Sequence, residues 1–119
     1  MTTEQDRAAK IAALNDAFRS GARPELGRIM ITASARDSVA AWPLGVIVLH
    51  DLVKSFIGFT ADNDPYGEHD FGSFEHVGQT FFWKIEYFDR QSNFTLGTEH
   101  PDDPAKCERV LTIMLASDY

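Results

Sequence analysis

Basic side chains are absent from the middle of this sequence, where no Lys or Arg lies between Lys54 and Lys84. Over all 119 residues, 18 acidic residues outnumber 11 basic ones, which gives a formal net charge of −7 at pH 7. Residues 55–119 hold 12 acidic and four basic side chains, whereas residues 1–54 hold six and seven. A DNA- or RNA-binding protein needs clustered Lys and Arg to displace counter-ions from phosphate. We therefore expect no direct binding of nucleic acid, and instead an attraction to basic protein surfaces.

Cysteine and long apolar runs are also scarce. The single Cys107 cannot form an internal disulfide. No apolar run approaches the roughly 18 residues that a membrane span requires, and the opening MTTEQDRAAK lacks the hydrophobic segment of a secretory signal. We therefore expect a cytoplasmic protein that folds as one domain over residues 1–119, a length that buries a core without disulfides or metal.

The common catalytic motifs are missing as well. There is no G-x-S-x-G, no P-loop and no G-x-G-x-x-G, which argues against nucleophilic acyl transfer and nucleotide binding. His69, His76 and His100 lack the spacing of zinc ligands. Cys107 begins an apolar stripe, and we expect it to pack as a small hydrophobic residue rather than act as a nucleophile. The main interpretation therefore includes no catalytic residue, no metal and no cofactor.

The densest polar chemistry lies in residues 62–72, DNDPYGEHDFG. As a calcium loop beginning at Asp62, it has suitable residues at positions 1, 3 and 6, but Tyr66 stands at position 5 and Ser73 replaces the bidentate Glu at position 12. The Asn, Pro and Gly residues are turn formers, so the segment is also typical of a structural loop. Three roles remain open: a surface for a basic partner, an irregular Ca²⁺ or Mg²⁺ site, and turn building. The residues assigned to partner binding are Asp62, Asp64, Tyr66, Glu68, His69, Asp70 and Glu75.

Local signals predict a helix and then a strand in the first third of the chain. Thr3 and Asp6 have the spacing of a capping box, and Gly21 followed by Pro24 ends the helix. Residues 28–32, RIMIT, are apolar and β-branched, which favours a strand.

A second helix is predicted to begin at Pro43, which suits the first turn of a helix. A strand over residues 46–49 is the alternative, because this stretch is rich in β-branched residues. Residues 34–42 carry no decisive pattern. The apolar stripe of the helix comprises Val46, Leu49, Val53 and Phe56.

A hairpin is predicted between strands over residues 71–77 and 80–88, with Gly78 and Gln79 forming its two-residue turn. This register would pair Phe74 with Trp83. Alternation then assigns one face of the second strand to the core, and the other face carries two further aromatic residues that a loop over 91–101 or a partner would cover. The core face comprises Phe81, Trp83, Ile85 and Tyr87, and the second face includes Phe82 and Phe88.

A last helix is predicted to begin at Asp102 or Asp103, with Pro104 in its first turn. Its stripe, at i, i+3, i+4, i+7 and i+8, comprises Cys107, Val110, Leu111, Met114 and Leu115. The predicted fold class is therefore α+β, a small antiparallel sheet of about three strands with about three helices.

Three segments resemble an uncharacterised bacterial family known as domain of unknown function 3768. They are FTADNDPYGEHDFGSF (residues 59–74), FWKIEYFD (82–89) and RVLTIMLASDY (109–119). The likeness extends back to LNDAFR (14–19), so it covers most of the chain, and the DNDPxGEHDFG motif is specific. The chain departs from the usual family pattern between residues 33 and 53.

The resemblance implies no assigned activity. It implies a setting among accessory genes of alphaproteobacterial chromosomes, plasmids and prophages, which favours an anti-defence role. We therefore predict a small acidic interaction protein, an inhibitor of anti-CRISPR or antirestriction type, that occupies the basic nucleic-acid-binding surface of a host defence complex. It would act as a monomer or homodimer, without contacting nucleic acid or membrane.

Two alternatives stay open. The acidic surface could serve only solubility. The chain could also be a small metal-dependent hydrolase or metal-binding protein, in which residues 62–70 supply carboxylates and an imidazole for a cation or for acid–base chemistry.

Overall fold

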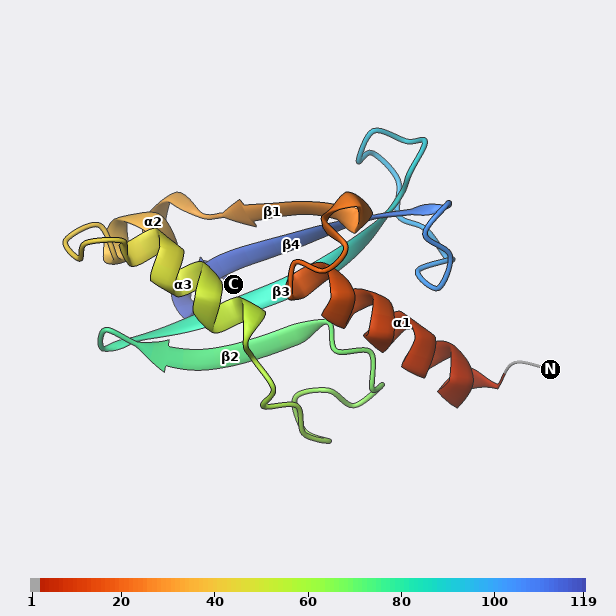
Figure 1. The fold of residues 1–119 in the computed structure, drawn as a ribbon, viewed down its shortest axis with the longest axis horizontal. Helices are drawn as coiled ribbons and strands as arrows, with labels where there is room; N and C mark the ends of the chain where they lie inside the picture. Colours follow the sequence, from red (N-terminus) through yellow and green to blue (C-terminus); the bar gives the residue numbers. More distant parts are fainter. Residues whose placement is uncertain (1–2) are drawn as a thin grey trace.

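The computed structural model describes residues 3–119, and its centre is a sheet with strand order β1–β4–β3–β2 (Figure 1). β1 runs parallel to β4, and the β4–β3 and β3–β2 pairs are antiparallel. The strands are β1 (Gly27–Ile31), β2 (Phe71–His76), β3 (Gln79–Asp89) and β4 (Cys107–Leu115).

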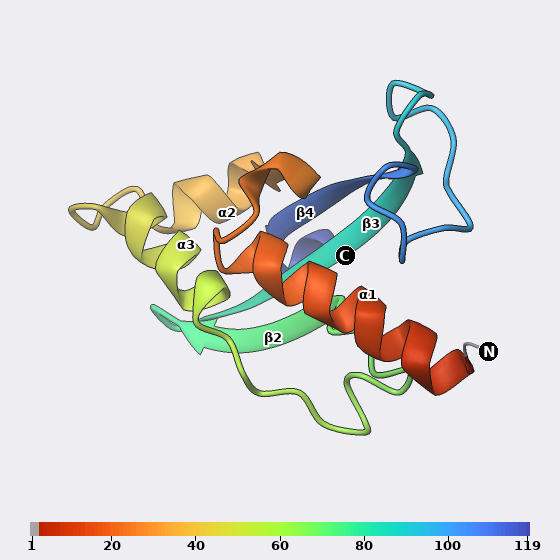
Figure 2. The same ribbon diagram turned by 45° about the vertical axis from the view of Figure 1, so that its right-hand side comes forward.

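Three helices accompany this sheet: α1 (Glu4–Arg19), α2 (Ala33–Ser38) and α3 (Gly45–Lys54). Helices α1 and α3 lie over the same face of the sheet, as two views show (Figures 1 and 2). Short 3₁₀ turns, η1 (Pro24–Leu26) and η2 (Ala116–Asp118), precede β1 and follow β4. The predicted α+β class is confirmed, with a mixed sheet of four strands where about three antiparallel ones were expected.

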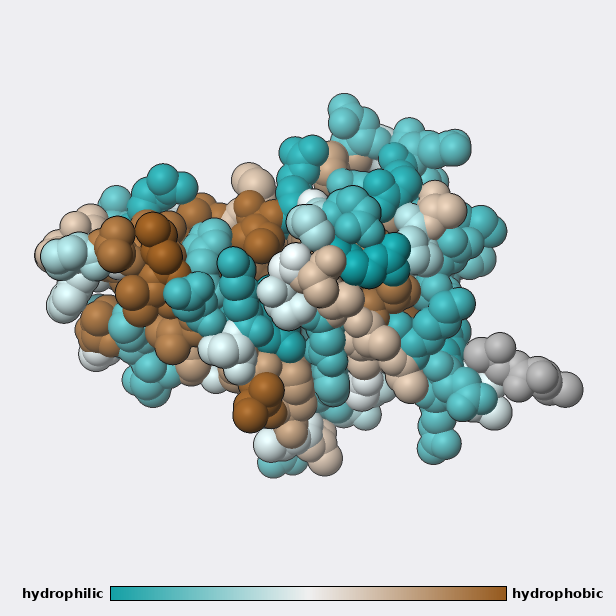
Figure 3. All heavy atoms as spheres, in the orientation of Figure 1, coloured by the Kyte–Doolittle hydropathy of each residue, from teal (hydrophilic) through white to brown (hydrophobic). Residues whose placement is uncertain are grey.

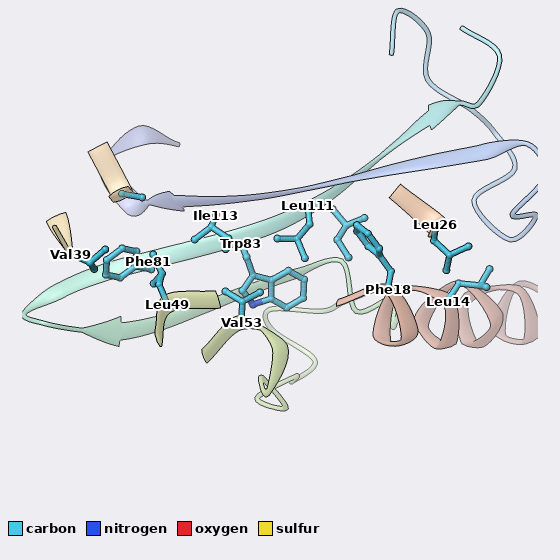
Figure 4. Close-up of a cluster of buried hydrophobic side chains, with 12 residues drawn as sticks. Leu14, Phe18, Leu26, Val39, Leu49, Val53, Phe81, Trp83, Leu111 and Ile113 are labelled. Carbon is cyan, nitrogen blue, oxygen red and sulfur yellow. The ribbon is translucent and has the colours of Figure 1, made fainter. Parts of the chain in front are cut away.

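The hydrophobic core fills the space between the sheet and helices α1 and α3 (Figure 4). Alternation along the strands sends every second side chain into this layer, which is why the predicted core face of β3 is confirmed. The principal members are Leu14 and Phe18 from α1, Leu49 and Val53 from α3, Phe81 and Trp83 from β3, and Leu111 and Ile113 from β4.

The signals that predicted the two ends of the first helix are confirmed. The Thr3 hydroxyl accepts a hydrogen bond from the Asp6 N–H at 3.0 Å, and the reciprocal capping bond is present. The helix that was predicted to begin at Pro43 is α3, which begins at Gly45, so Pro43 precedes its first turn. Leu44 precedes it with φ of +57°, a left-handed conformation that costs a non-glycine residue free energy.

The hairpin turn differs from the prediction by one position. The turn residues are Val77 and Gly78, both at positive φ, which matches the twist of a two-residue hairpin. Phe74 therefore pairs with Phe81 and not with Trp83. Because the register moves by two residues along β3, every side chain stays on its predicted face.

The predicted last helix is wrong, because Cys107–Leu115 forms the strand β4. Its apolar residues fit a helical stripe, but they equally fill both faces of a central strand. Alternate residues from Cys107 to Ile113 face the core, and Met114 is buried on the opposite face. The parallel pairing with β1 and the antiparallel pairing with β3 decide the outcome. Cys107 is fully buried as expected, and burial raises the pKa of its thiol.

The second face of the sheet is partly covered by the chain itself. Tyr119 packs edge-on against Phe82, with ring centroids 5.7 Å apart. Phe94, within the 91–101 loop, packs against Phe88 at 5.8 Å and lies under the Arg28 guanidinium. The loop is therefore the cover for Phe88, one of the two alternatives that the sequence left open. Within residues 3–119, no helix is long and apolar enough to cross a membrane.

Candidate functional site

The loop that carries the DNDPYGEHDFG motif is fastened to α1 through His69. The His69 Nδ1 atom lies 2.9 Å from Asp16 Oδ2, and its Nε2 atom lies 3.7 Å from Asp64 Oδ2. The imidazole stacks on Phe59 with the ring centroids 3.9 Å apart. His69 has φ of +56°, so these contacts hold a residue in a backbone conformation that costs free energy.

Asp64 faces inward and helps to shape the loop. It is buried, and its Oδ1 atom accepts a hydrogen bond from the His69 N–H at 3.1 Å. This carboxylate closes the turn from within, which agrees with the turn-building role considered for the motif.

Glu68 is tied to a core network of four polar residues. The Tyr87 hydroxyl donates to Glu68 Oε1 at 3.1 Å, and Asn15 donates to both the Glu68 carbonyl and the Tyr87 hydroxyl at 2.9 Å. Arg109 donates a hydrogen bond from Nε to Asn15 Oδ1 at 2.6 Å. We call these four residues, Arg109, Asn15, Tyr87 and Glu68, the Arg109 network. The network therefore links β4, α1, β3 and the motif loop.

Arg109 is fully buried, and none of its hydrogen bonds within the described chain goes to a carboxylate. Its guanidinium also donates to the Pro101 carbonyl and to Cys107 Sγ, and it lies 5.4 Å from the centre of the Tyr87 ring. Burial lowers the pKa of Arg109 and raises that of Tyr87. The charge is compensated by neutral acceptors and an aromatic face.

Desolvation also affects two carboxylates of the motif. Partial burial raises the pKa of Glu68, although the hydrogen bond from Tyr87 opposes this change. Partial burial also raises the pKa of Asp70, and the neighbouring Asp64 adds to the effect. Perturbed carboxylates gathered in one place are typical of functional sites, although buried networks also produce them.

The remaining predicted site residues are exposed. Asp62 and Glu75 lie on the surface, and Tyr66 is 80% exposed. Glu75 accepts a hydrogen bond from the Thr80 hydroxyl across the hairpin at 2.6 Å. The structure thus brings Asp64, His69 and Asp16 together, and leaves Asp62 and Glu75 apart from them.

A groove of about 430 Å³ runs between the first turns of α1 and the motif loop. We call it the acidic groove, because Glu4 stands on the α1 side and Glu68 on the loop side. Arg7 is the one basic residue among the described residues that line the groove: its guanidinium donates to the Glu99 carbonyl and lies 3.6 Å from Asp102 Oδ1, and its charge also acts to lower the pKa of Glu68. The remaining lining residues are Gln5, Ala8, Ile11, Pro65 and Tyr66.

The carboxylates of the motif do not converge on a common point. Asp64 is directed at His69, Glu68 at Tyr87, and Asp62 is exposed. Across residues 3–119, no three His, Cys, Asp or Glu side chains are grouped as a metal ion requires. Asp64 and Glu68 are thus each engaged by a partner within the chain.

Residues of the site outside the motif escaped the sequence prediction, among them Glu4, Asn15, Asp16, Tyr87 and Arg109. Asn15 lies on the apolar stripe of α1, four residues after Ile11, and such a polar interruption is the one available signal. Tyr87 was expected in the core, but its hydroxyl partners lie far away in sequence. Arg109 occupies a core position of a segment that was expected to be helical.

These features define a small α+β domain in which the motif loop contacts α1 through His69 and Asp16 and borders the acidic groove. Residues 44–118 match the model of a family described as "Protein of unknown function (DUF3768)". The match covers more than half of the chain, so the chain belongs to this family, as the resemblance predicted. Searches of curated proteins and of solved structures returned no match.

Proposed function

We propose that the chain is a non-enzymatic interaction protein that binds a basic side chain of a partner protein in the acidic groove. The observation that carries the proposal is the lining of this groove. A carboxylate stands on either side, the exposed Tyr66 ring lies at its border, and Arg7, the basic residue among its described lining, is already paired with Asp102 and with the Glu99 carbonyl.

An arginine or lysine side chain has the chemistry that this groove recognises. Its charge would lie between Glu4 and Glu68, and its aliphatic part would contact Ile11. The Tyr66 ring supplies a face for a cation–π contact, which is worth about 0.5–2 kcal/mol. Because Tyr87 and Asn15 already fix the position of Glu68, binding costs little conformational entropy at this side chain.

The predicted partner-binding residues divide into three groups under this proposal. Tyr66 and Glu68 contact the partner directly. Asp62 and Glu75 are exposed, and act through long-range attraction that salt weakens. Asp64 and His69 shape the loop that presents the others, and the Asp70 carbonyl accepts a hydrogen bond from the Ile85 N–H, which joins the end of the loop to β3.

We further propose that the partner is a nucleic-acid-binding protein of a host defence system in the cytoplasm, such as a CRISPR effector or a restriction enzyme. The support for this is the charge of residues 55–119, which hold 12 acidic and four basic side chains. An acidic surface of this kind is electrostatically complementary to a basic surface that binds the phosphates of nucleic acid. An anti-CRISPR or antirestriction role carried by a mobile element follows from this partner.

Binding of a short arginine-containing peptide to the full chain tests the groove. We expect a one-to-one, saturable complex at low salt, which Tyr66→Ala weakens about threefold to thirtyfold because the cation–π contact is lost without a change of charge. Removal of one carboxylate by Glu4→Gln should also weaken it.

Glu86→Gln is the matched control for the charge change, since Glu86 is exposed on β3 and belongs to no part of the groove. Equal weakening by Glu86→Gln and Glu4→Gln, with no effect of Tyr66→Ala, would show that only overall charge matters. The metal-dependent alternative stays a prediction, and calorimetric titration with Ca²⁺, Mg²⁺, Mn²⁺ and Zn²⁺ addresses it.

A further inference from the structure

The first turns of helix α3 carry apolar residues on both sides. Leu49 and Val53 face the core and are buried, while Ile47 is 57% exposed and Val48 is 40% exposed on the outer side. Apolar side chains on the outer side of a helix are normally covered by a second layer. Within residues 3–119, no such layer covers Ile47 and Val48.

The preceding loop extends the exposed surface. Trp42 is 51% exposed and Leu44 is 69% exposed. The positive φ of Leu44 places a large apolar residue where glycine would cost least. We call Trp42, Leu44, Ile47 and Val48 the α3 patch, and Figure 3 shows hydrophobic residues gathered over α3.

The size of the patch suits the centre of an interface between two proteins. Four large side chains with these exposures present on the order of 400 Å² of apolar surface, which is as large as the largest patch on an ordinary monomer. A stable dimer buries about 800 Å² per subunit, so the patch supplies roughly half and polar neighbours would supply the rim. The exposed neighbours on the helices are Arg36, Asp37, Asp51 and Lys54.

The distribution of charge favours a second copy of this chain as the occupant. The α3 patch belongs to residues 1–54, where seven basic and six acidic residues nearly balance. Two copies meeting here do not bring together like-charged regions. The acidic groove, in contrast, lies by the N-terminal turns of α1, at the other end of the long axis of the molecule (Figure 1).

We propose that two copies of this chain associate about a two-fold axis through the α3 patch. In an antiparallel pairing of the two helices centred between Ile47 and Val48, Asp51 of one copy faces the N-terminal end of the partner helix, where negative charge is favourable. Lys54 then faces the partner's Trp42, an arrangement suited to a cation–π contact. The two acidic grooves remain free at the outer ends of the dimer.

Sedimentation velocity of the full chain over ~1 to ~300 μM tests this, because the range covers dissociation constants typical of small homodimers. We expect a concentration-dependent shift from monomer to dimer. Ile47→Glu should raise the dissociation constant by about a hundredfold or more, since the symmetry places two carboxylates in one apolar contact.

Ile57→Glu is the matched control, because Ile57 is 88% exposed, lies outside the α3 patch and receives the same substitution. Circular dichroism of both variants checks that the fold is intact. A further arm mixes Ile47→Glu with Ile47→Lys, and the opposite charges should restore association that neither variant shows alone.

A wild-type chain that stays monomeric throughout the range would overturn the proposal, and would indicate that a different molecule covers the patch. Equal weakening by Ile47→Glu and Ile57→Glu would overturn it as well, as would a failure of the mixed variants to associate. These outcomes are independent of peptide binding in the acidic groove, because that groove lies outside the α3 patch.

Discussion

Arg109 determines much of the local order around the candidate site. A buried guanidinium is tolerated only when its N–H groups are satisfied, and Asn15 Oδ1 accepts a hydrogen bond from Arg109 Nε at 2.6 Å. Asn15 in turn holds Tyr87 and the Glu68 carbonyl. A single amide thus connects the buried charge with the loop that borders the acidic groove.

Asn15→Leu should therefore destabilise the chain strongly. The substitution leaves Arg109 Nε buried without its acceptor and removes two further hydrogen bonds, so we expect a loss of about 3–5 kcal/mol in the free energy of unfolding, measured by urea denaturation. Gln5→Leu, an exposed change of similar size on the same helix, should stay within about 0.5 kcal/mol. Similar small losses for both variants would contradict the role of the Arg109 network.

Glu68 makes stability depend on pH in a definite direction. Burial raises its pKa in the folded chain, so over the window above the ordinary glutamate value of about 4.3 the folded state binds more protons than the unfolded state. The contribution of Glu68 to stability therefore falls as pH rises through that window. The free energy of unfolding of the Glu68→Gln variant, relative to that of the wild type, should therefore be higher at neutral pH than at pH ~4.

Urea denaturation of both proteins at the two pH values provides the measurement. The comparison isolates Glu68, because Asp70, whose pKa is also raised, is present in both proteins. A stability difference that is constant with pH, or that changes in the opposite direction, would be inconsistent with a desolvated Glu68 carboxylate.

At the scale of elements, close contact between β2 and β3 is essential to the hairpin. A Cβ atom added at Gly72 would lie 2.3 Å from Trp83 Nε1 and 2.6 Å from its Cε2 atom. Trp83 is fully buried beneath α3, so the indole has no free space into which it could move. The absent side chain at Gly72 is thus part of the packing of the core.

Gly72→Ala should cost about 2–4 kcal/mol, because it forces the indole or the strand out of position. The midpoint and slope of urea unfolding give the value. Gly97→Ala is the control, since the atom nearest to its added Cβ would be the Tyr87 carbonyl oxygen at 3.6 Å, an ordinary contact distance. A Gly72→Ala variant as stable as Gly97→Ala would show that the indole has room to adjust.

Elements with local signals were predictable from the sequence. The capping box at Thr3 and Asp6 and the hairpin near Gly78 depend on neighbouring residues alone. β4 was not predictable in this way, because Arg109 on its core face and Val110 on its opposite face interrupt the alternation of apolar and polar residues that distinguishes a strand from a helix. Its pairing with β1 joins segments about 80 residues apart.

The candidate site was predictable only where it lies within the motif. Tyr66 and Glu68 stand in a conspicuous acidic run, and both border the acidic groove. Asn15 and Arg109 are separated by 94 residues, and Asn15 is 53 residues from Glu68. Contacts over such distances arise from the fold, and a single sequence carries no local signal for them.

At the scale of the whole molecule, two surfaces of different chemistry occupy opposite ends. The molecule extends 51 Å along its longest axis, with the α3 patch near one end and the acidic groove towards the other. An apolar interface at one end and a charged groove at the other would let a dimer present two grooves in opposite directions. A partner with repeated basic sites would then bind with increased overall affinity.

The measurement that tests the central claim most directly maps the arginine-peptide titration onto the full chain by ¹H–¹⁵N NMR. We expect saturable shifts confined to the groove, at Glu4, Arg7, Tyr66 and Glu68, while Asp62 and Glu75 change little once salt screens them. Shifts spread evenly over all exposed carboxylates, or no saturable shift at Tyr66 and Glu68, would contradict the acidic groove as a binding site.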